Sequence, residues 1–492
     1  MLEKNYSMPT MMTVYLTGGN MRHLRLTALL TCIALVAMLA LSNVAVAGTS
    51  GMIGINVLLN TIPTSKILNQ LAKYGTVLDV VPEIKALTLQ APASQLDAIR
   101  ALSFVTAANP DAARTGAPVS EVAVTDFTAG LNTWDLDAIN ATDFGAGRTI
   151  GYDGTGVYVA VLDTGLLDNW RDYFPVERIA TEYAMCFGGG GGEVGNVSSP
   201  TNKWEHDNNS HGTHVTSTIL GYSLSGTPVN GVAPMAKVIP VKVLNQNGSG
   251  WSSVVARGIT YVGDLKAGPL KNFPVVINMS LGGPDLDIME KTAIDYAISQ
   301  GVIIVAAAGN EGTAGMGYPG AYEPVISVAA SGWIGEWTAA GWWHTLDVPD
   351  PTNPADYYIT DFSSRALPGQ DLDVAAPGSW CVGPYQNNSG SSSSSINYYY
   401  LGGTSMASPH VAGIVALMVQ KDPTLTAFEA ETALEGSAVY LAPGSRTVNN
   451  GSGAMVTYSW GADATGAGLA TADAALAQLD SSLTVPKKGG KH

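Results

Sequence analysis

The chain has 492 residues, of which 46% are apolar and 13% charged, with a formal net charge of −16. This balance excludes a disordered chain, because a sequence so rich in apolar residues can bury a core of substantial size. The negative charge argues against nucleic acid as a partner, since a phosphate backbone would be repelled.

The segment 21–47 has the pattern of an export signal. Basic residues after Met21 precede the apolar run 28–41, and Ala45-Val46-Ala47 forms a small-x-small cleavage site. A membrane span takes about 20 apolar residues, so the alternative of a membrane anchor is weaker. We therefore expect export of the protein, with Met21 as a more natural start than the first residue.

Export would leave two cysteines in the protein, Cys186 and Cys381. They would lie in a compartment where disulfides persist. The sequence leaves two alternatives equally open, which are one bridge between the two residues or two unpaired buried thiols.

Residues 52–110 are predicted to form a small separate α+β unit. Its segments follow the order strand, helix, two strands, helix, strand, at 55–59, 64–74, 77–89, 93–102 and 104–106. This order is that of a ferredoxin-like module. The unit contains no histidine or cysteine, so nothing in it indicates catalysis. It continues into a loop-like stretch, 112–118, that a protease could reach.

The region from about 130 to 480 is predicted to be one α/β domain with a mostly parallel central sheet and helices on both faces. Its nearly continuous apolar runs are 157–162, 238–243, 275–279, 302–307 and 325–329. Strands of this kind are buried on both faces, as in a parallel sheet covered by helices. Residues 481–492 are predicted to be a short C-terminal tail.

Three stretches of this region have the composition of surface insertions. Residues 187–193 contain five consecutive glycines but lack the Gly-Lys-Ser/Thr of a phosphate loop, so we expect a flexible loop. Residues 333–358 carry four tryptophans, for which a locally packed hairpin or flap is favoured over a ligand cage. Residues 387–400, with a run of serines, are predicted to be a polar loop.

Four polar side chains stand at the ends of predicted elements. Asp163 and Asn310 each follow a buried strand, and His211 and Ser405 each stand where a loop enters a helix. A serine hydroxyl needs an adjacent base, and an imidazole serves when a carboxylate holds its tautomer and stabilises its cation. An amide side chain and the N–H groups at a helix start can donate to a developing oxyanion.

The segments around these residues resemble the subtilisin family of serine proteases, in the chain order aspartate, histidine, serine. They are VYVAVLDTG at 157–165, NNSHGTHV at 208–215, IIVAAAGN at 303–310 and GGTSMASPHVAG at 402–413. The resemblance extends from about residue 134 to 479 and implies a subtilisin-like fold. It also implies that Asp163 orients the imidazole, His211 is the general base and then the acid, and Ser405 attacks. Asn310 and the Ser405 N–H would form the oxyanion hole.

The resemblance also carries over the substrate-binding segments Ser280-Leu281-Gly282 and Gly248-Ser249-Gly250. In the family these segments pair with an extended substrate, one on each side, as in strand addition to a sheet edge. Gly317 is similar to the glycine at the floor of the pocket for the residue before the cut, which implies acceptance of large apolar side chains. Glu311 at the rim of this pocket would admit some basic ones.

The same resemblance assigns a role to residues 52–115, which are similar to the family's propeptide in topology and position. Such a segment assists folding and inhibits the protease within the same chain. We expect self-cleavage between residues 114 and 130, and a secreted, monomeric endopeptidase that hydrolyses protein or peptide substrates.

The chemistry of such an endopeptidase requires no cofactor. Structural calcium is common in the family. Here Asp172 alone stands at a usual ligand position, and the loop 222–230 lacks the usual asparagine pattern. We therefore assign no calcium site from the sequence.

Three other functions compete with this interpretation of the sequence. Histidines at 206, 211 and 214 suggest a metal site, but no carboxylate or thiol completes a recognised zinc spacing, and His214 and His410 are expected to be structural. A non-catalytic relative on the same fold would usually lack the nucleophile, the base or the oxyanion donor, and none is missing here. A ligase or transpeptidase would use the same acyl-enzyme with an amine acceptor, which the sequence does not separate from hydrolysis.

Overall fold

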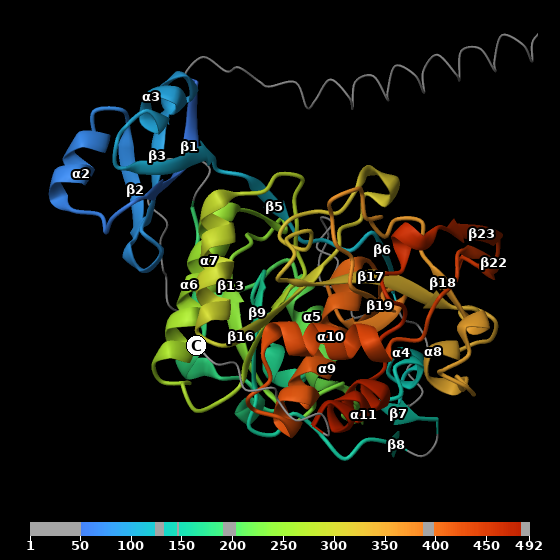
Figure 1. The fold of residues 1–492 in the computed structure, drawn as a ribbon. Helices are drawn as coiled ribbons and strands as arrows, with labels where there is room; N and C mark the ends of the chain where they lie inside the picture. Colours follow the sequence, from blue (N-terminus) through green and yellow to red (C-terminus); the bar gives the residue numbers. More distant parts are fainter. Residues whose placement is uncertain (1–50, 124–131, 145–146, 190–202, 387–397, 484–492) are drawn as a thin grey trace, which may run out of the picture. The chain divides into compact units, whose positions relative to one another are not determined.

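The computed structural model describes residues 51–123, 132–144, 147–189, 203–386 and 398–483 (Figure 1). The predicted export signal at 21–47 lies outside these residues, as do most of the glycine run and most of the serine-rich stretch. No helix within the described ranges is both long enough and apolar enough to cross a membrane. The chain from Met52 onward forms one compact unit.

The first sheet has the strand order β2-β3-β1-β4 and is antiparallel (Figure 1). Its elements are β1 (Met52–Leu59), α2 (Ser65–Leu71), β2 (Thr76–Val81), β3 (Ala86–Pro92), α3 (Leu96–Arg100) and β4 (Val105–Pro110). The Thr64 side chain caps α2 by accepting a hydrogen bond from the N–H of Ile67. Val57, Leu71 and Leu89 are among the residues that form its own small core. The element order agrees with the ferredoxin-like module predicted for 52–110.

The second sheet has the order β10-β13-β9-β15-β16-β17-β18, and β19 also pairs with β17. Its strands are β9 (Tyr158–Asp163), β10 (Met185–Cys186), β13 (Lys237–Lys242), β15 (Val275–Met279), β16 (Val302–Ala307), β17 (Ile326–Trp333), β18 (Tyr357–Ile359) and β19 (Val374–Pro377). All neighbouring strands run parallel except β18, which is antiparallel to β17. Each of the five predicted apolar runs corresponds to a strand of this sheet.

Helices cover both faces of this sheet. Successive side chains of a strand point to opposite faces, so a strand that is apolar throughout can pack against helices on both sides. The helices are α5 (His211–Leu220), α6 (Ser252–Ala267), α7 (Ile288–Ser299) and α9 (Thr404–Lys421). In β9, Val159 and Val161 pack in the core that includes α5 and α9, whereas Ala160 and Leu162 pack in the core that includes α6 and α7. The predicted α/β architecture is therefore confirmed.

Shorter elements complete the unit. They are β5 (Ala113–Thr115), β6 (Ser120–Ala123), α4 (Trp134–Ala138), β7 (Thr142–Asp143), β8 (Gly147–Arg148), β11 (Tyr222–Leu224), β12 (Thr227–Val229), β14 (Ser249–Trp251), α8 (Trp342–Thr345), β20 (Cys381–Pro384), β21 (Tyr398–Gly402), α10 (Ala427–Ser437), β22 (Gly444–Asn449), β23 (Met455–Trp460) and α11 (Ala472–Leu483). The helix α11 thus extends beyond residue 480, where the tail was predicted to begin.

The tryptophan-rich insertion is packed. Trp134 stacks on Trp333 with ring centroids 6.3 Å apart, and Trp342 stacks on Tyr400 at 5.8 Å. Because β17 and β18 pair antiparallel around this insertion, the predicted packed hairpin is confirmed. The polar-loop prediction is wrong at residues 398–400, which are buried tyrosines of β21 that pair with β20 and β6.

The two cysteines are free and buried, Cys186 in β10 and Cys381 in β20. Of the two alternatives that the sequence left open, the structure therefore has the unpaired thiols. Burial raises the pKa of both thiols, which keeps them in the unreactive protonated form.

Candidate active site

A carboxylate and an imidazole meet where β9 ends and α5 begins. Asp163 is the last residue of β9, His211 is the first residue of α5, and both are fully buried. His211 Nδ1 lies 2.8 Å from Asp163 Oδ1 and 3.0 Å from Oδ2. Since a carboxylate only accepts, this contact makes Nδ1 the donor and leaves Nε2 of the neutral ring as an acceptor.

A buried polar network connects the loop before His211 to the end of β9. Thr164 Oγ1 donates to Asp207 Oδ2 at 2.7 Å. The oxygens of Asp207 also accept from the backbone N–H groups of the two residues just before His211, at 2.9 and 2.8 Å. Burial raises the pKa of Asp207, although the charge of Lys242, 3.8 Å away, opposes this. The sequence analysis did not identify these supporting residues, because none stands in a position that spacing alone distinguishes.

Ser405 lies at the start of α9 and is 2% exposed. Its hydroxyl donates to the carbonyl oxygen of Ser280 at 3.2 Å, and His211 Nε2 has no hydrogen-bond partner among the described residues. The Ser280 oxygen and the His211 ring both border Gly116, where an added Cβ would lie 2.7 Å from that oxygen and 3.5 Å from His211 Cε1. The structure thus brings the hydroxyl and the imidazole to one cleft without a hydrogen bond between them, and such bonds are often long before substrate is in place.

Asn310 lies in the loop after β16, next to the start of α9. Its Oδ1 accepts from both the N–H and the hydroxyl of Thr404, each at 2.9 Å. These bonds fix the amide oxygen, so Nδ2 is the group that can donate to a ligand. Asn310 and Ser405 line the same pocket.

The pocket beside Ser405 also contains the residues predicted to hold the side chain before the cut. Its lining includes Gly317 and Glu311, which were predicted for this pocket, and Leu281 and Gly282 of a segment that was predicted to pair with the substrate backbone. One oxygen of Glu311 is already engaged, because Oε2 accepts from the Asn310 N–H at 2.7 Å and from the Ser364 hydroxyl at 3.0 Å.

The segment after the first sheet runs through this cleft as an added strand. The strand β5 pairs antiparallel with β14. On the same side, the Gly116 N–H donates to the carbonyl of Gly248, the residue before β14, at 2.8 Å. On the other side, Thr115 and Gly282 exchange two backbone hydrogen bonds of 2.9 Å. Both segments that were predicted to pair with a substrate therefore pair with residues 113–116 of the same chain.

Two contacts define the register of this segment. Ala117 lines the pocket beside Ser405, and the Val119 N–H donates to the Gly402 carbonyl at 2.6 Å. The residue between them is Pro118. Because Ala117 lines the pocket next to the hydroxyl and precedes Pro118, we place the peptide bond between these two residues at Ser405.

His206 and His214, which with His211 suggested a metal site, have separate partners in the described part of the chain. His206 is exposed and lies 3.0 Å from Asp168, whereas His214 Nε2 contacts the Cys381 carbonyl at 3.1 Å. Burial lowers the pKa of His214 to about 3, so this ring is neutral. His410 bonds through both ring nitrogens, which agrees with its predicted structural role.

Three groups of described side chains are close enough to hold a cation. They are Asp135 with Cys381 and His410, Asp137 with Asp143 and Asp347, and Asp371 with Asp373 and Glu431. His410 is not free to ligate. The other two groups are acidic and of the chemistry that calcium prefers, and burial raises the pKa of Asp137 and of Asp373 to about 7 in each case. Acidic groups are common without an ion, so we assign no metal to them.

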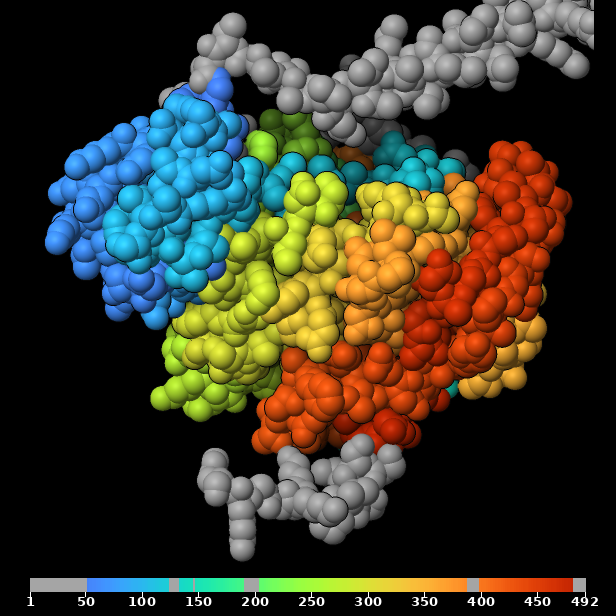
Figure 2. Space-filling view, turned by 45° about the horizontal axis from the view of Figure 1, so that its top comes forward, coloured from blue at the N-terminus to red at the C-terminus, as the bar shows by residue number. Residues whose placement is uncertain are grey.

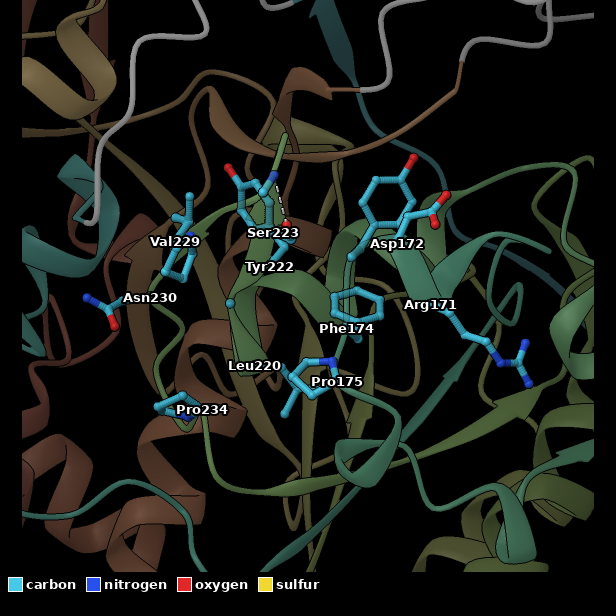
Figure 3. Close-up of a pocket in the computed structure, with 14 residues that line it drawn as sticks. Arg171, Asp172, Phe174, Pro175, Leu220, Tyr222, Ser223, Val229, Asn230 and Pro234 are labelled. Atoms are coloured by element: carbon cyan, nitrogen blue, oxygen red, sulfur yellow. Dashed lines mark hydrogen bonds between the residues drawn. The ribbon is translucent and has the colours of Figure 1, made fainter.

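A second pocket, of about 460 Å³, lies beside the β11–β12 hairpin (Figure 3). Its lining includes Asp172, Tyr222 and Asn230. Asp172 is the only side-chain carboxylate among the lining residues. Calcium takes six to eight oxygen ligands, which include backbone and amide carbonyls, and we assign no ion to this pocket.

Comparisons with known proteins give concordant results. The model of the subtilase family matches residues 154–462. The chain is 36% identical over 295 residues to subtilisin DY of Bacillus licheniformis, with 59% of this chain and 86% of that protein covered. It is also 36% identical to subtilisin E of Bacillus subtilis strain 168, of whose length the match covers 62%. Among solved structures, fervidolysin from Fervidobacterium pennivorans, a keratinolytic enzyme related to subtilisin, is similar with a TM-score of 0.61 and 25% identity, covering 87% of this chain and 62% of that one.

Proposed function

The chain belongs to the subtilase family of serine peptidases, and we propose that Asp163, His211 and Ser405 are its catalytic triad. The observation that carries this proposal is the buried contact of Asp163 with His211 Nδ1, which leaves Nε2 without a partner among the described residues, while the Ser405 hydroxyl lies in the adjoining pocket. We further propose that Asn310 Nδ2 and the Ser405 N–H form the oxyanion hole.

The proposed reaction follows from these positions. His211 Nε2 takes the proton of the Ser405 hydroxyl as Oγ attacks the substrate carbonyl carbon, and Asp163 stabilises the imidazolium that forms. The carbonyl oxygen becomes an oxyanion that accepts hydrogen bonds from Asn310 Nδ2 and the Ser405 N–H. The imidazolium then protonates the leaving amine, and a water molecule activated by the same imidazole releases the acyl group.

Residues 52–117 are proposed to be a propeptide that inhibits the protease within the precursor. In support of this, β5 pairs with β14 in the cleft and β1 packs against α7. Figure 2 shows the blue surface of the N-terminal unit next to the yellow-green surface that contains α7. Asn56 Nδ2 donates to Asp287 Oδ2 at 2.8 Å, and Asp287 caps α7. These contacts link the N-terminal unit to the helix that borders the cleft.

A second contact of this kind involves α6, whose own N-cap residue makes no side-chain hydrogen bond. Asp111 instead accepts from the Ser253 N–H at 2.9 Å and from its hydroxyl at 2.6 Å. An acid from the N-terminal unit thus satisfies the free N–H groups at the start of α6 and complements its dipole. Because this bond is made only when the N-terminal unit is bound, it supports a role for that unit in folding.

The first self-cleavage is proposed between Ala117 and Pro118, the bond that is presented to Ser405. This position lies within the predicted range 114–130 and moves the end of the proposed propeptide from residue 115 to 117. We also propose export through 21–47, a monomeric state and acceptance of large apolar side chains before the cut. The last point is supported by Gly317, which lines the pocket without a side chain.

The test compares the full chain with its Ser405→Ala variant and with Ser445→Ala, an exposed serine, as the matched control. The wild type and the control should cut themselves and hydrolyse casein, whereas Ser405→Ala should remain uncut and lose about 10⁶-fold in activity, the scale found for subtilisin. N-terminal sequencing locates the cut, and a product assay with added amine separates hydrolysis from aminolysis. Spontaneous cutting of purified Ser405→Ala would contradict the assignment.

A further inference from the structure

An arginine of the occupying strand is completely buried against α7. Arg114 Nε donates to Glu290 Oε1 at 3.0 Å, and its Nη2 donates to Glu290 Oε2 at 2.5 Å. The two side chains are 0% and 1% exposed. Nη2 also donates to the backbone carbonyl of Asp285 at 3.0 Å. The pocket thus offers a forked guanidinium two carboxylate oxygens and one carbonyl.

This pocket belongs to the substrate-binding cleft. Arg114 is the middle residue of β5 and pairs with Gly250 of β14, in one of the two segments predicted to bind substrate. With the bond between Ala117 and Pro118 at the hydroxyl, Arg114 is the fourth residue before the cut. Glu290 lies on α7, in the part of the chain that stays with Ser405 after the cut.

Departure of residues 52–117 would leave the Glu290 carboxylate without its cation. Burial raises the pKa of Glu290, and the nearby positive charge of Arg114 opposes this rise. Asp287 is a further acid near the same position and adds to the negative charge. A substrate that covers this position in place of β5 would bury the carboxylate again, and a buried carboxylate without a partner is strongly unfavourable, so a substrate cation is favoured there.

We propose that Glu290 is a specificity-determining residue and that the mature enzyme selects substrates with arginine at the fourth position before the cut. This inference rests on the proposed function. An extended substrate that pairs with Gly250 and Gly282 as β5 does would place its fourth side chain in the Glu290 pocket. Arginine fits better than lysine, because its planar fork can bond both carboxylate oxygens and the Asp285 carbonyl together. An apolar side chain would leave the carboxylate buried and unpaired.

The test uses enzyme matured from the full chain and four peptides that differ at one position. Arg-Thr-Gly-Ala, linked through its last carbonyl to a fluorogenic amine, is compared with peptides that carry citrulline, lysine or leucine in place of arginine. Citrulline has nearly the shape of arginine without its charge. We expect kcat/KM for the arginine peptide to exceed that for the citrulline and leucine peptides by about 10²-fold, the size expected for an unpaired buried charge.

Glu290→Gln should bring the ratio of the arginine to the citrulline peptide close to one. Glu177→Gln, which removes the same charge from an exposed position, should keep the wild-type ratio. If Glu290→Gln does not fold, the double variant Arg114→Gln with Glu290→Gln removes both charges of the buried pair and is measured instead.

Equal hydrolysis of the arginine and leucine peptides by wild-type enzyme would overturn the inference and leave the proposed function intact. Preference that persists in Glu290→Gln would assign it to another residue and would also overturn the inference. Failure of the wild type to hydrolyse any peptide would refute the proposed function itself, and the inference with it.

Discussion

Asp163 with His211, and Arg114 with Glu290, are both buried pairs of the cleft, but different parts of the chain supply them. The first pair comes from β9 and α5 of the α/β domain, and the second joins β5 to α7. Under the proposed maturation the first pair persists, whereas the second loses its arginine. A buried hydrogen-bonded pair can therefore serve either a permanent chemical role or an exchangeable recognition role, depending on whether both partners stay.

The permanent pair is tested most strongly by Asp163→Asn. An amide at this position can donate to Nδ1 and so favours the wrong tautomer of His211, which should slow self-cleavage of the precursor by about 10⁴-fold. Asp168→Asn, which changes an exposed acid, should process as the wild type does. Processing of Asp163→Asn at the control rate would show that the buried contact has no catalytic role.

Asn310→Ala removes a neutral donor next to the permanent pair. The proposed oxyanion would lose one hydrogen bond, so self-cleavage should slow by about 10²–10³-fold. Circular dichroism would check that the fold is retained. The matched control is Asn169→Ala, which removes another partly buried amide. A loss no larger than that of the control would exclude Asn310 from the oxyanion hole.

Arg114→Gln breaks the exchangeable pair in the precursor. With Ser405→Ala present to prevent cutting, the variant should reduce the free energy of unfolding by about 3 kcal/mol, because Glu290 would be left buried without a cation. Arg100→Gln breaks an exposed pair with Asp97 and should change it by less than about 1 kcal/mol. Urea unfolding followed by fluorescence measures both, and equal losses would show that burial of the Arg114 pair adds no stability.

Glu336 extends the comparison to a buried acid hydrogen-bonded to Tyr358 and Ser379. Burial raises its pKa from 4.5 to about 8, so the folded protein holds a proton that the unfolded chain releases above pH 4.5. Stability from this group is therefore lost as pH rises from about 4.5 to 8. The free energy of unfolding of wild type minus that of Glu336→Gln should fall across this window in a urea titration. A difference that is constant or rises with pH would contradict the assignment.

The sequence alone determined the central sheet and the candidate catalytic residues. Continuous apolar runs such as 275–279 and 302–307 can be buried on both faces only in a covered parallel sheet, and they became β15 and β16. Asp163 and Asn310 were identifiable because they follow such strands within motifs of recognisable type. These are local signals, and each can be read within a short window of residues.

Only the tertiary structure decided which residues meet over long separations. Arg114 was part of a predicted loop and Glu290 part of an unremarked helix, and at a separation of 176 positions in the sequence no local signal indicates their ion pair. The same holds for the free thiols and for the register that presents Ala117 and Pro118 to Ser405. Pairing of this kind depends on how separate elements pack together, and a pattern of neighbours in the sequence does not contain that information.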